Sequence, residues 1–334
     1  MNLFAKNRRI EIKIGNFNHC SSVCAHQNGV LIAWYAGSGE CQDDQSVYVM
    51  HVNGDQQSTP LRIGNKTGNP VLIPTEGQEA VLLWSKFEDI APMSHIVERW
   101  KYCSLWATSV SYHNGRIHLI GTSKQITEPT QHLLGRCNPI KHKGQHILPL
   151  YDEMGRQAVI FRGKELDFES IGRFGEDMIQ PTIWVGRWKD RIHSLSRNFM
   201  SETQFKARAS YSDDGGKTWC TPKPTAIPNR DSSLHVFRWN DYKLLLWNNT
   251  PLTQRENMTL GIMDGLDVKP VCIMENYGAY PSICADDAGN LNMTYTSLNR
   301  TIIHHAWNHK YFKKVLKSSL GNKEEENETK TEER

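Results

Sequence analysis

Polar side chains that could bind or react with a ligand recur at the ends of short apolar runs in this chain. Some of them open such a run: His19, Asn69, Asn138, Gln180, Ser232 and Tyr280. Others close a later apolar run: Lys86, Asp152, Glu153, Arg197 and Asn248. Guanidinium forks grip carboxylates, whereas amides and acids bind hydroxyl groups. Brought together, these side chains would suit a small anionic ligand with many hydroxyl groups, such as an acidic sugar.

A repeated unit of sequence positions these residues. Each copy has a polar or Pro-containing opening, an apolar strand, a turn, and a second apolar strand that ends in polar residues. Two of the copies read HCSSVCAHQNGVLIAWYAG from His19 and QPTIWVGRWKDRIHSLSRN from Gln180. The six copies begin 50, 69, 42, 52 and 48 residues apart. This spacing leaves room in each unit for two further strands, so a unit has about four.

The sequence therefore predicts an all-β fold, a single six-bladed β-propeller over residues 1–315. Apolar runs of four to eight residues alternate with turn signals such as NG and DDAGN, and helical periodicity is hard to find. A β-sandwich would give similar turn spacing but would not explain a unit that recurs in register. Because the innermost strand of each blade begins at the central channel, the opening and closing residues are expected to line one pocket.

Composition narrows the possible partners and cofactors. The 39 basic and 36 acidic residues nearly balance, which argues against a nucleic-acid partner. No signal peptide or membrane-length apolar run is found, so we expect a soluble, cytoplasmic protein without a membrane partner. The eight cysteines lack CxxC pairs and favour reduced thiols over disulfides or metal ligands. We expect no metal or other cofactor, and the sequence leaves the oligomeric state open.

Two further segments have a structural interpretation. The stretch SDDGGKTW, Ser212 to Trp219, combines glycines that permit positive φ, acceptors for turn amides and an aromatic side chain that can pack beneath the loop. It predicts a locked hairpin between outer strands of a blade. Residues 316–334 are charged and nearly free of large apolar side chains, which predicts a disordered tail.

The same stretch also resembles the Asp-box, Ser-x-Asp-x-Gly-x-Thr-Trp, of sialidases and related propellers. The segments HCSS, GNPV, GRCNP, MIQP and AYPS mark the blades in the same order as in a branch of bacterial proteins with BNR or Asp-box repeats. The whole chain is thus similar to the sialidase-like superfamily. Asp-boxes lie on the rim of many unrelated propellers, so this one supports the fold and leaves the function open.

The resemblance implies roles for particular residues. Sialidases bind the substrate carboxylate with three arginines, attack with a tyrosine paired with a glutamate, and use an aspartate as acid and base. By position, Tyr280 corresponds to the nucleophile, or else it forms an aromatic wall of the pocket. Arg197 and Arg255 correspond to two of the arginines, although Arg255 could instead be a solvated loop charge. Asp44 lies 25 residues after His19, the spacing of the catalytic aspartate; its neighbours Asp43 and Glu40 compete for the role.

Two departures from the sialidase pattern affect the mechanism. His19 stands where the first arginine is expected, and Gln180 stands where the glutamate that activates the tyrosine is expected. Arg136 and Lys86 could supply replacement cations, which suggests an acidic sugar other than ordinary sialic acid. Without a carboxylate beside the phenol, a mechanism with two carboxylates, drawn from Asp44, Glu40 and Glu153, competes with a tyrosine nucleophile.

Several functions therefore remain as hypotheses. The first is a glycoside hydrolase of the exo-sialidase type that cleaves an acidic glycan, with Asp44, Tyr280 and Glu153 as catalytic residues. The second is a propeller that binds an acidic sugar without cleaving it. The third is a scaffold that presents propeller faces to protein partners. A lyase that acts on uronic-acid polymers is a further alternative.

Overall fold

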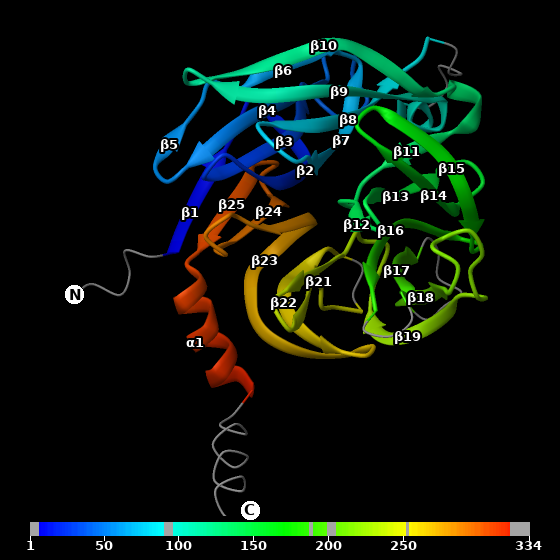
Figure 1. The fold of residues 1–334 in the computed structure, drawn as a ribbon, viewed down its shortest axis with the longest axis vertical. Helices are drawn as coiled ribbons and strands as arrows, with labels where there is room; N and C mark the ends of the chain where they lie inside the picture. The colour runs from blue at the N-terminus through cyan, green and yellow to red at the C-terminus, as the bar shows by residue number, and fades with distance from the viewer. Residues whose placement is uncertain (1–6, 90–95, 187–189, 199–204, 252–253, 321–334) are drawn as a thin grey trace, which may run out of the picture.

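The computed structural model describes residues 7–89, 96–186, 190–198, 205–251 and 254–320 (Figure 1). Almost all regular structure in these ranges is β-strand. The first sheet has the strands β2 (Phe17–His26), β3 (Gly29–Gly37), β4 (Ser46–Asn53), β5 (Gln56–Gln57) and β6 (Leu61–Asn65). The second has β7 (Thr67–Pro74), β8 (Glu79–Phe87), β9 (Cys103–His113) and β10 (Arg116–Thr127).

The middle of the chain forms two more sheets of this size. The third sheet has β11 (Leu133–Gly135), β12 (Ile140–His142), β13 (Gln145–Asp152), β14 (Gln157–Lys164) and β15 (Asp167–Phe174). The fourth has β16 (Met178–Val185), β17 (Ile192–Asn198), β18 (Lys206–Ser212) and β19 (Lys223–Pro228). Each of these sheets is built from sequential antiparallel strands, as the alternation of apolar runs and turn signals predicts.

The fifth sheet is larger and contains both ends of the described chain. Its seven strands are β20 (His235–Trp239), β21 (Tyr242–Asn248), β22 (Glu256–Asp264), β23 (Asp267–Ala285), β24 (Leu291–Ser297), β25 (Ile302–Trp307) and β1 (Asn7–Ile12). The helical segments in the described residues are η2 (Ile96–Tyr102), η3 (Pro129–Gln131) and α1 (His309–Leu320).

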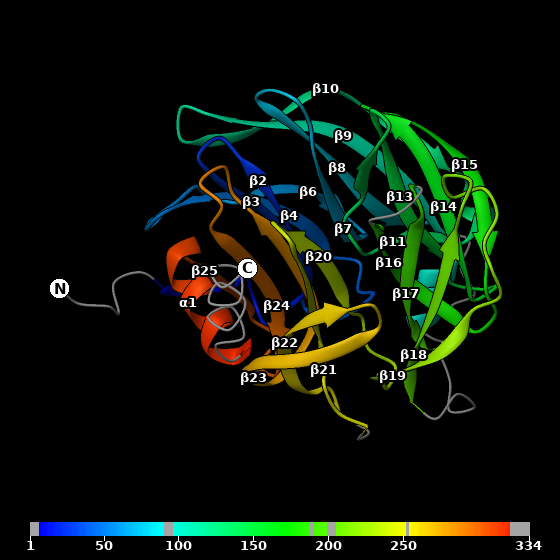
Figure 2. The ribbon, with the colours of Figure 1, turned by 60° about the horizontal axis from the view of Figure 1, so that its bottom comes forward.

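The sheets are arranged around a common centre in a propeller, so the prediction of an all-β propeller is confirmed (Figures 1 and 2). The predicted division into six separate blades is not seen in the hydrogen bonding, because four sheets have the four or five strands of a blade and the fifth has seven. The cause is β23, a strand of 19 residues. Its first part pairs with β22 and its last part with β24, which joins two groups of strands into one sheet.

The strand β1 closes the ring. It pairs antiparallel with β25, from Asn7 opposite Trp307 to Ile12 opposite Ile302. Figure 1 shows β1 beside β25 at the edge of this sheet. The first and last parts of the described chain are thereby held together by backbone hydrogen bonds, while β2 contacts both β7 and β23 at the centre of the ring.

Apolar side chains fill the spaces between neighbouring sheets. Trp34 and Trp247 are among the largest fully buried side chains. All eight cysteines are free, and six of them are buried. The helix α1 packs Phe312 and Leu316 against the core of the seven-stranded sheet. It begins before residue 316 and includes residues 316–320 of the expected disordered tail, whereas residues 321–334 lie outside the described residues.

The hairpin between β18 and β19 has the predicted locking contacts. The Asp214 carboxylate accepts hydrogen bonds from the Lys217 amide at 3.0 Å and from the Thr218 hydroxyl at 2.6 Å. The Trp219 indole donates to the Gly216 carbonyl at 2.9 Å and stacks on Phe174. The turn thus fastens two outer strands of the fourth sheet, away from the centre of the ring.

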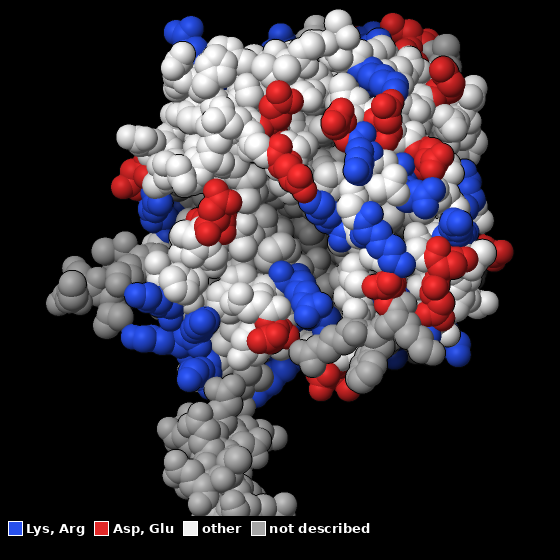
Figure 3. All heavy atoms as spheres, viewed as in Figure 1, with Lys and Arg blue, Asp and Glu red and all other residues white. Residues whose placement is uncertain are grey.

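The surface charge and the lengths of the helices bear on binding to nucleic acids and membranes. On the face shown in Figure 3, acidic and basic side chains are interspersed, with a basic cluster near α1. None of the helices in the described ranges is long and apolar enough to cross a membrane.

Candidate active site

A pocket of about 320 Å³ lies at the centre of the ring, where the inner strands meet; we call it the channel pocket. It draws residues from every sheet. The lining residues are His19, Tyr35, Glu40, Asn69, Trp100, Tyr151, Glu153, Ile179, Gln180, Arg197, Asp231, Arg255, Tyr280 and Arg300.

A repeated irregularity of the backbone positions several of these side chains. Asn69, Gln180 and Tyr280 each have a positive φ, of 45°, 53° and 55°, and each precedes a proline. At each of them the pairing of the inner strand with the next strand shifts register. Proline cannot donate to the ladder, and a bulge re-aims its side chains. The Asn-Pro, Gln-Pro and Tyr-Pro dipeptides therefore direct one polar side chain per inner strand toward the centre.

These backbone conformations are costly for residues other than glycine. A non-glycine residue in the left-handed region costs on the order of 1–3 kcal/mol, and such positions gather at functional sites. In the first sheet the residue at the corresponding register position is Cys20, with φ of 56°, and not His19. The sequence alignment of His19 with the other opening residues is therefore shifted by one position, although His19 does line the pocket.

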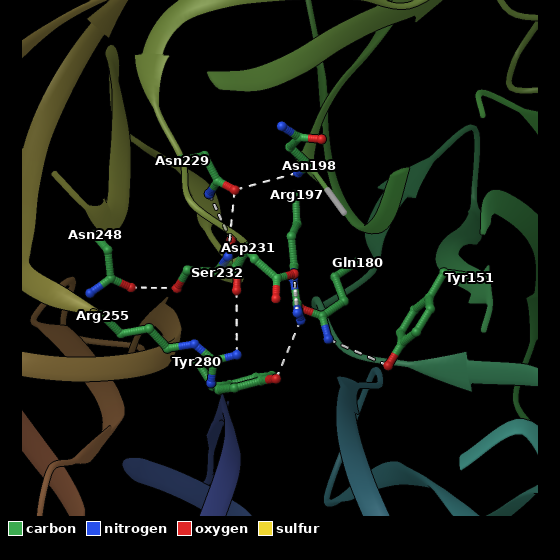
Figure 4. Close-up of polar contacts among 10 residues, drawn as sticks. All are labelled: Tyr151, Gln180, Arg197, Asn198, Asn229, Asp231, Ser232, Asn248, Arg255 and Tyr280. Carbon is green, nitrogen blue, oxygen red and sulfur yellow. Dashed lines mark hydrogen bonds and ion pairs between the residues drawn. The ribbon is translucent and has the colours of Figure 1, made fainter. Parts of the chain in front are cut away.

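Arg197 lies at the centre of a polar network (Figure 4). Its Nε donates to the Asp231 carboxylate at 2.6 Å, and its Nη1 donates to the Gln180 amide oxygen at 3.1 Å and to the Tyr280 hydroxyl oxygen at 3.3 Å. Burial lowers the pKa of this guanidinium, but Tyr280 and Asp231 outweigh burial and leave its pKa above the usual value. Arg197 is therefore a fixed cation whose charge is already paired.

Two other guanidiniums are less engaged. Arg255 lies over the Tyr280 ring, with its central carbon 4.9 Å from the ring centroid, and donates to the backbone carbonyl of Asp231 at 3.3 Å. Arg300 approaches Nδ1 of His19 at 3.5 Å and lies over the Phe17 ring. Within the described residues neither of them forms an ion pair with a carboxylate. Both are therefore available to an anionic ligand.

His19 is buried between these cations. Its Nδ1 is 3.1 Å from the Thr296 hydroxyl, and its ring meets Tyr280 edge-on with centroids 4.4 Å apart. Burial, followed by the charges of Arg300 and Arg255, holds the imidazole pKa well below its ordinary value. At neutral pH His19 is thus an uncharged imidazole, which cannot replace the charge of the arginine that the sialidase pattern leads one to expect.

Arg136 supports the pocket from beneath. It is 1% exposed, donates to the backbone carbonyls of Ser21 at 3.0 Å and Pro281 at 2.7 Å, and lies 5.4 Å from the Tyr280 ring centroid. The structure does not place it among the lining residues. Its contacts tie the bulge of β23 to that of β2, so it positions Tyr280.

Two glutamates enter the pocket from loops, in addition to Asp231. Glu40 follows β3, and its Oε1 accepts hydrogen bonds from the Tyr35 hydroxyl at 3.3 Å and the Trp100 indole at 3.2 Å. Glu153 follows β13, and burial raises its pKa to about 7, with Arg197 opposing the shift. A carboxyl with this pKa is about half protonated at neutral pH. Its protonated form can act as a general acid.

Tyr151 forms the wall beside Glu153. Its hydroxyl oxygen accepts hydrogen bonds from the side-chain amides of Asn69 and Gln180, both at 3.4 Å. Burial and the neighbouring Glu153 raise its pKa well above the ordinary value. Tyr151 is therefore a neutral phenol that holds two of the re-aimed amides in place.

The structure brings together most of the predicted site residues. His19, Glu40, Glu153, Gln180, Arg197, Arg255 and Tyr280 all line the channel pocket. Asp44 does not; its carboxylate accepts hydrogen bonds from the Ser38 amide and hydroxyl, both at 2.9 Å, and so shapes the loop that carries Glu40. Lys86 also lies outside, with its ammonium 5.7 Å from the Trp106 ring centroid.

The other opening and closing residues hold strands together. The Asn138 side chain bonds the Ser22 hydroxyl and the Val23 carbonyl, and the Ser232 hydroxyl donates to Asn248. Asp152 accepts from the amide of Gly155 and pairs with Arg173 at 2.7 Å. Their polar atoms are used within the protein, and none of these residues is in the lining of the channel pocket.

Sequence reasoning missed six lining residues: Tyr35, Trp100, Tyr151, Ile179, Asp231 and Arg300. Tyr151 directly precedes the closing residues Asp152 and Glu153, so the alternation of strand faces could have identified it. Arg300 lies in the turn after β24, beyond the last repeated strand, and Trp100 lies in η2. No signal in the repeat marks these two positions.

A ring of sheets around one charged pocket defines a propeller with a central pocket. The structure of Trypanosoma rangeli sialidase in complex with sialic acid is similar, with a TM-score of 0.66 and 12% identity over 96% of this chain and 62% of that chain. The Hadza microbial sialidase Hz136 has a TM-score of 0.68 and 13% identity over 88% of this chain and 66% of that chain. This chain thus spans less than two thirds of either sialidase chain.

A protein of unknown function from Dyadobacter fermentans has a TM-score of 0.66 and 11% identity over 90% of this chain and 98% of its own. At such identities these similarities show the fold alone. Comparison with curated proteins gives no match. The family model of the BNR repeat-like domain matches residues 28–293. The chain therefore belongs to this family, with a sialidase-like fold.

Proposed function

We propose that the protein is a glycoside hydrolase that cleaves an acidic sugar from a glycan or glycoconjugate in the channel pocket. The observation that carries the proposal is that three guanidiniums, of Arg197, Arg255 and Arg300, share one pocket with the carboxyl groups of Glu40 and Glu153. Sialic acid, which Trypanosoma rangeli sialidase binds, is a carboxylated sugar of the kind that such a pocket suits.

The ligand carboxylate would bind between Arg255 and Arg300. Arg197 already pairs with Asp231, whereas the other two guanidiniums form no ion pair with a described residue. Of the arginines that lower the pKa of His19, Arg300 and Arg255 have the largest effects, so both charges act on the same part of the pocket. This arrangement shifts the anion toward the side of the pocket on which His19 replaces an arginine.

The two glutamates supply the acid and the base. In its protonated form Glu153 would donate a proton to the glycosidic oxygen, while the Glu40 carboxylate takes a proton from the attacking water. This assignment replaces Asp44 by Glu40, its neighbour on the same loop. Tyr280 stays the alternative nucleophile, as the resemblance implies; in the described part of the chain its hydroxyl accepts from Arg197 and has no hydrogen bond with a carboxylate.

Turnover of fluorogenic substrates tests the proposal. Purified protein is expected to release 4-methylumbelliferone from a glycoside of sialic acid or of a uronic acid. Glu153→Gln is expected to lower kcat about 10²–10⁴-fold, as loss of a general acid does. If Tyr280→Phe instead causes the larger loss and the first product retains the anomeric configuration, tyrosine is the nucleophile. Failure to release any sugar from a broad panel of acidic glycosides would rule out the hydrolase.

Non-catalytic binding is a second candidate because of Gln180. The side chain of Gln180 is an amide at a position where the resemblance predicts a carboxylate. Its oxygen accepts a hydrogen bond from Arg197, and its nitrogen donates one to Tyr151. Calorimetric binding of an acidic sugar without turnover would support this candidate. An unsaturated product, detected by mass spectrometry, would instead assign the protein to the lyases.

The five hydrogen-bonded sheets can be counted as six blades, and the six copies of the sequence repeat support this count. We infer that the seven-stranded sheet is two blades, β20 to the first part of β23 and the last part of β23 to β1, because β23 pairs with different partners over its two parts. On this count every copy of the repeated unit supplies the inner strands of one blade.

A further inference from the structure

A second cleft, of about 350 Å³, lies between the first sheet and the strands β24 and β25. It is bounded by the turn before β3, the turn after β4, residues 286–292 and residues 304–308. We call it the closure cleft because it adjoins β1, which closes the ring and contributes Arg8 to its wall. It shares no lining residue with the channel pocket.

Side-chain amides dominate the walls of the closure cleft. The asparagines that line it are Asn28, Asn53, Asn290, Asn292 and Asn308. Asn28 and Asn53 are exposed at its mouth, and within the described residues their side-chain amides have no hydrogen-bond partner. Each of them offers two N–H donors and one acceptor to a ligand.

Two of the three charged residues that line the cleft, Asp286 and Arg8, are already engaged. Asp286 Oδ1 accepts from the amides of Ala288 at 3.0 Å and Asn290 at 2.9 Å, and Oδ2 accepts from the side chains of Asn290 at 3.1 Å and Asn292 at 3.4 Å. Four hydrogen bonds fill the acceptor sites of a carboxylate. Arg8 pairs with Asp55 at 2.9 Å. Asp287, the third charged residue of the lining, is exposed and accepts a hydrogen bond from the Asn28 backbone amide at 3.5 Å, so its carboxylate can also accept from ligand hydroxyl groups.

His304 supplies an unused buried acceptor. It is 2% exposed, and its Nε2 lies 2.9 Å from the Asn292 amide oxygen, so Nε2 carries the proton. Burial, then the charges of His305 and Arg8, lowers the imidazole pKa to about 3, which leaves the ring neutral. Nδ1 is then an acceptor, and within the described part of the chain it has no partner. A buried acceptor without a donor is unfavourable, and a ligand donor would relieve this cost.

Trp307 gives the cleft an aromatic wall. Its indole packs against Tyr311 and Phe312 of α1, with ring centroids 6.1 and 5.8 Å apart, so its orientation is fixed by the helix. Fixed aromatic faces pack against the C–H groups of ligands that also need polar partners at their edges.

We propose that the closure cleft binds a neutral, polyhydroxylated ligand, one sugar unit of a glycan, with a ligand hydroxyl donating to Nδ1 of His304. The free amides of Asn28 and Asn53 donate to the other hydroxyl oxygens, and Trp307 packs against the ring. The proposal is independent of any activity in the channel pocket, because it uses none of that pocket's residues.

Histidine-selective ¹⁵N NMR on the full chain tests the proposal. The probes are methyl β-D-galactopyranoside, methyl α-D-glucopyranoside and methyl α-D-mannopyranoside at millimolar concentrations. At least one is expected to shift the Nδ1 resonance of His304 to the position of a hydrogen-bonded acceptor, and to leave that of His19 in the channel pocket unchanged. Saturation-transfer NMR on the same samples then gives the affinity.

Two variants and one control complete the test. His304→Leu and Asn53→Leu are each expected to weaken binding by about tenfold, the ratio that corresponds to one lost hydrogen bond. Asn53 is exposed at the end of β4, so its variant remains informative if His304→Leu fails to fold. His305→Leu changes the neighbouring ring, which bonds Tyr295, and is expected to bind normally. The proposal is wrong if no probe shifts His304, or if both variants bind as the wild type does.

Discussion

The Ser212–Trp219 turn and the channel pocket both gather charged and aromatic residues, but they use them in opposite ways. In the turn the Thr218 hydroxyl and amide, with the neighbouring Ser212 and Lys217, saturate the Asp214 carboxylate and lower its pKa to about 2. In the pocket Arg255 and Arg300 have no carboxylate partner among the described residues, and the pKa of Glu153 is raised instead. Side chains whose hydrogen bonds are all made within the protein indicate a structural role. Charged side chains without an ion-pair partner indicate a place where a ligand can bind.

The backbone shows the same contrast. The positive φ values of the turn fall on Gly215 and Gly216, for which they carry little cost. In the pocket they fall on Gln180 and Tyr280, side chains that tolerate this conformation poorly. Strain at residues that line a charged pocket is retained because the side chains must point inward.

Removal of the two unpaired cations should have the largest effect. The double variant Arg255→Ala, Arg300→Ala is expected to weaken the binding of an acidic sugar by roughly 10²–10⁴-fold, because each charged hydrogen bond contributes about 1.5–3 kcal/mol. Isothermal titration calorimetry measures the loss. The melting temperature should hardly change, and an equal loss with a neutral sugar analogue would contradict an anion site.

Glu153 should destabilise the protein at high pH. Its folded pKa of about 7 lies above its ordinary value of 4.5, so the folded state binds more protons between these values. The contribution of Glu153 to the unfolding free energy is therefore most favourable below pH 4.5. It is lost as the pH rises through 7. Glu153→Gln is expected to remove this fall and to raise the unfolding free energy at about pH 8 by up to about 3 kcal/mol. Urea unfolding at several pH values checks the sign.

Disruption of the satisfied turn should change stability and nothing else. Asp214→Ala is expected to cost about 1–2 kcal/mol of unfolding free energy, because the turn amides lose their acceptor. Sugar affinity, measured by calorimetry on the folded variant, should match the wild type. A large loss of affinity would show that the turn and the pocket are coupled.

Lys86 should have the smallest effect. It was predicted from its place at the end of a strand, but its ammonium lies over Trp106 and away from the lining residues. Lys86→Ala is expected to alter both sugar affinity and stability by less than about 0.5 kcal/mol. A tenfold loss of affinity would show that its side chain reaches the pocket.

Much of the fold could be predicted because the repeat is a property of the sequence. Each copy carries its own strand and turn signals, so the strands and their order around the centre follow from local patterns. The continuity of β23 did not follow. Residues 267–285 contain prolines at positions 270 and 281, yet the backbone pairs through both parts of this strand, and only the tertiary structure shows the join.

The site was only partly predictable for the same reason. Glu153, Arg197 and Tyr280 occupy repeated positions, so the pattern identified them. Arg300 and Trp100 come from connections that differ from one sheet to the next, and the choice between Glu40 and Asp44 depends on which carboxylate the loop turns inward. Two acids four residues apart in a loop carry no periodic signal that would distinguish them.

The pairing of β1 with β25 also constrains the order of folding. On the ribosome the first strand emerges long before its partner, and it has no neighbour on that side until about 300 residues later in the chain. Contacts of such sequence separation form slowly, and an unpaired strand edge is a template for association with other chains. The ring is therefore completed only after β25 has been synthesised, and the nascent chain is most vulnerable to aggregation before that strand is in place.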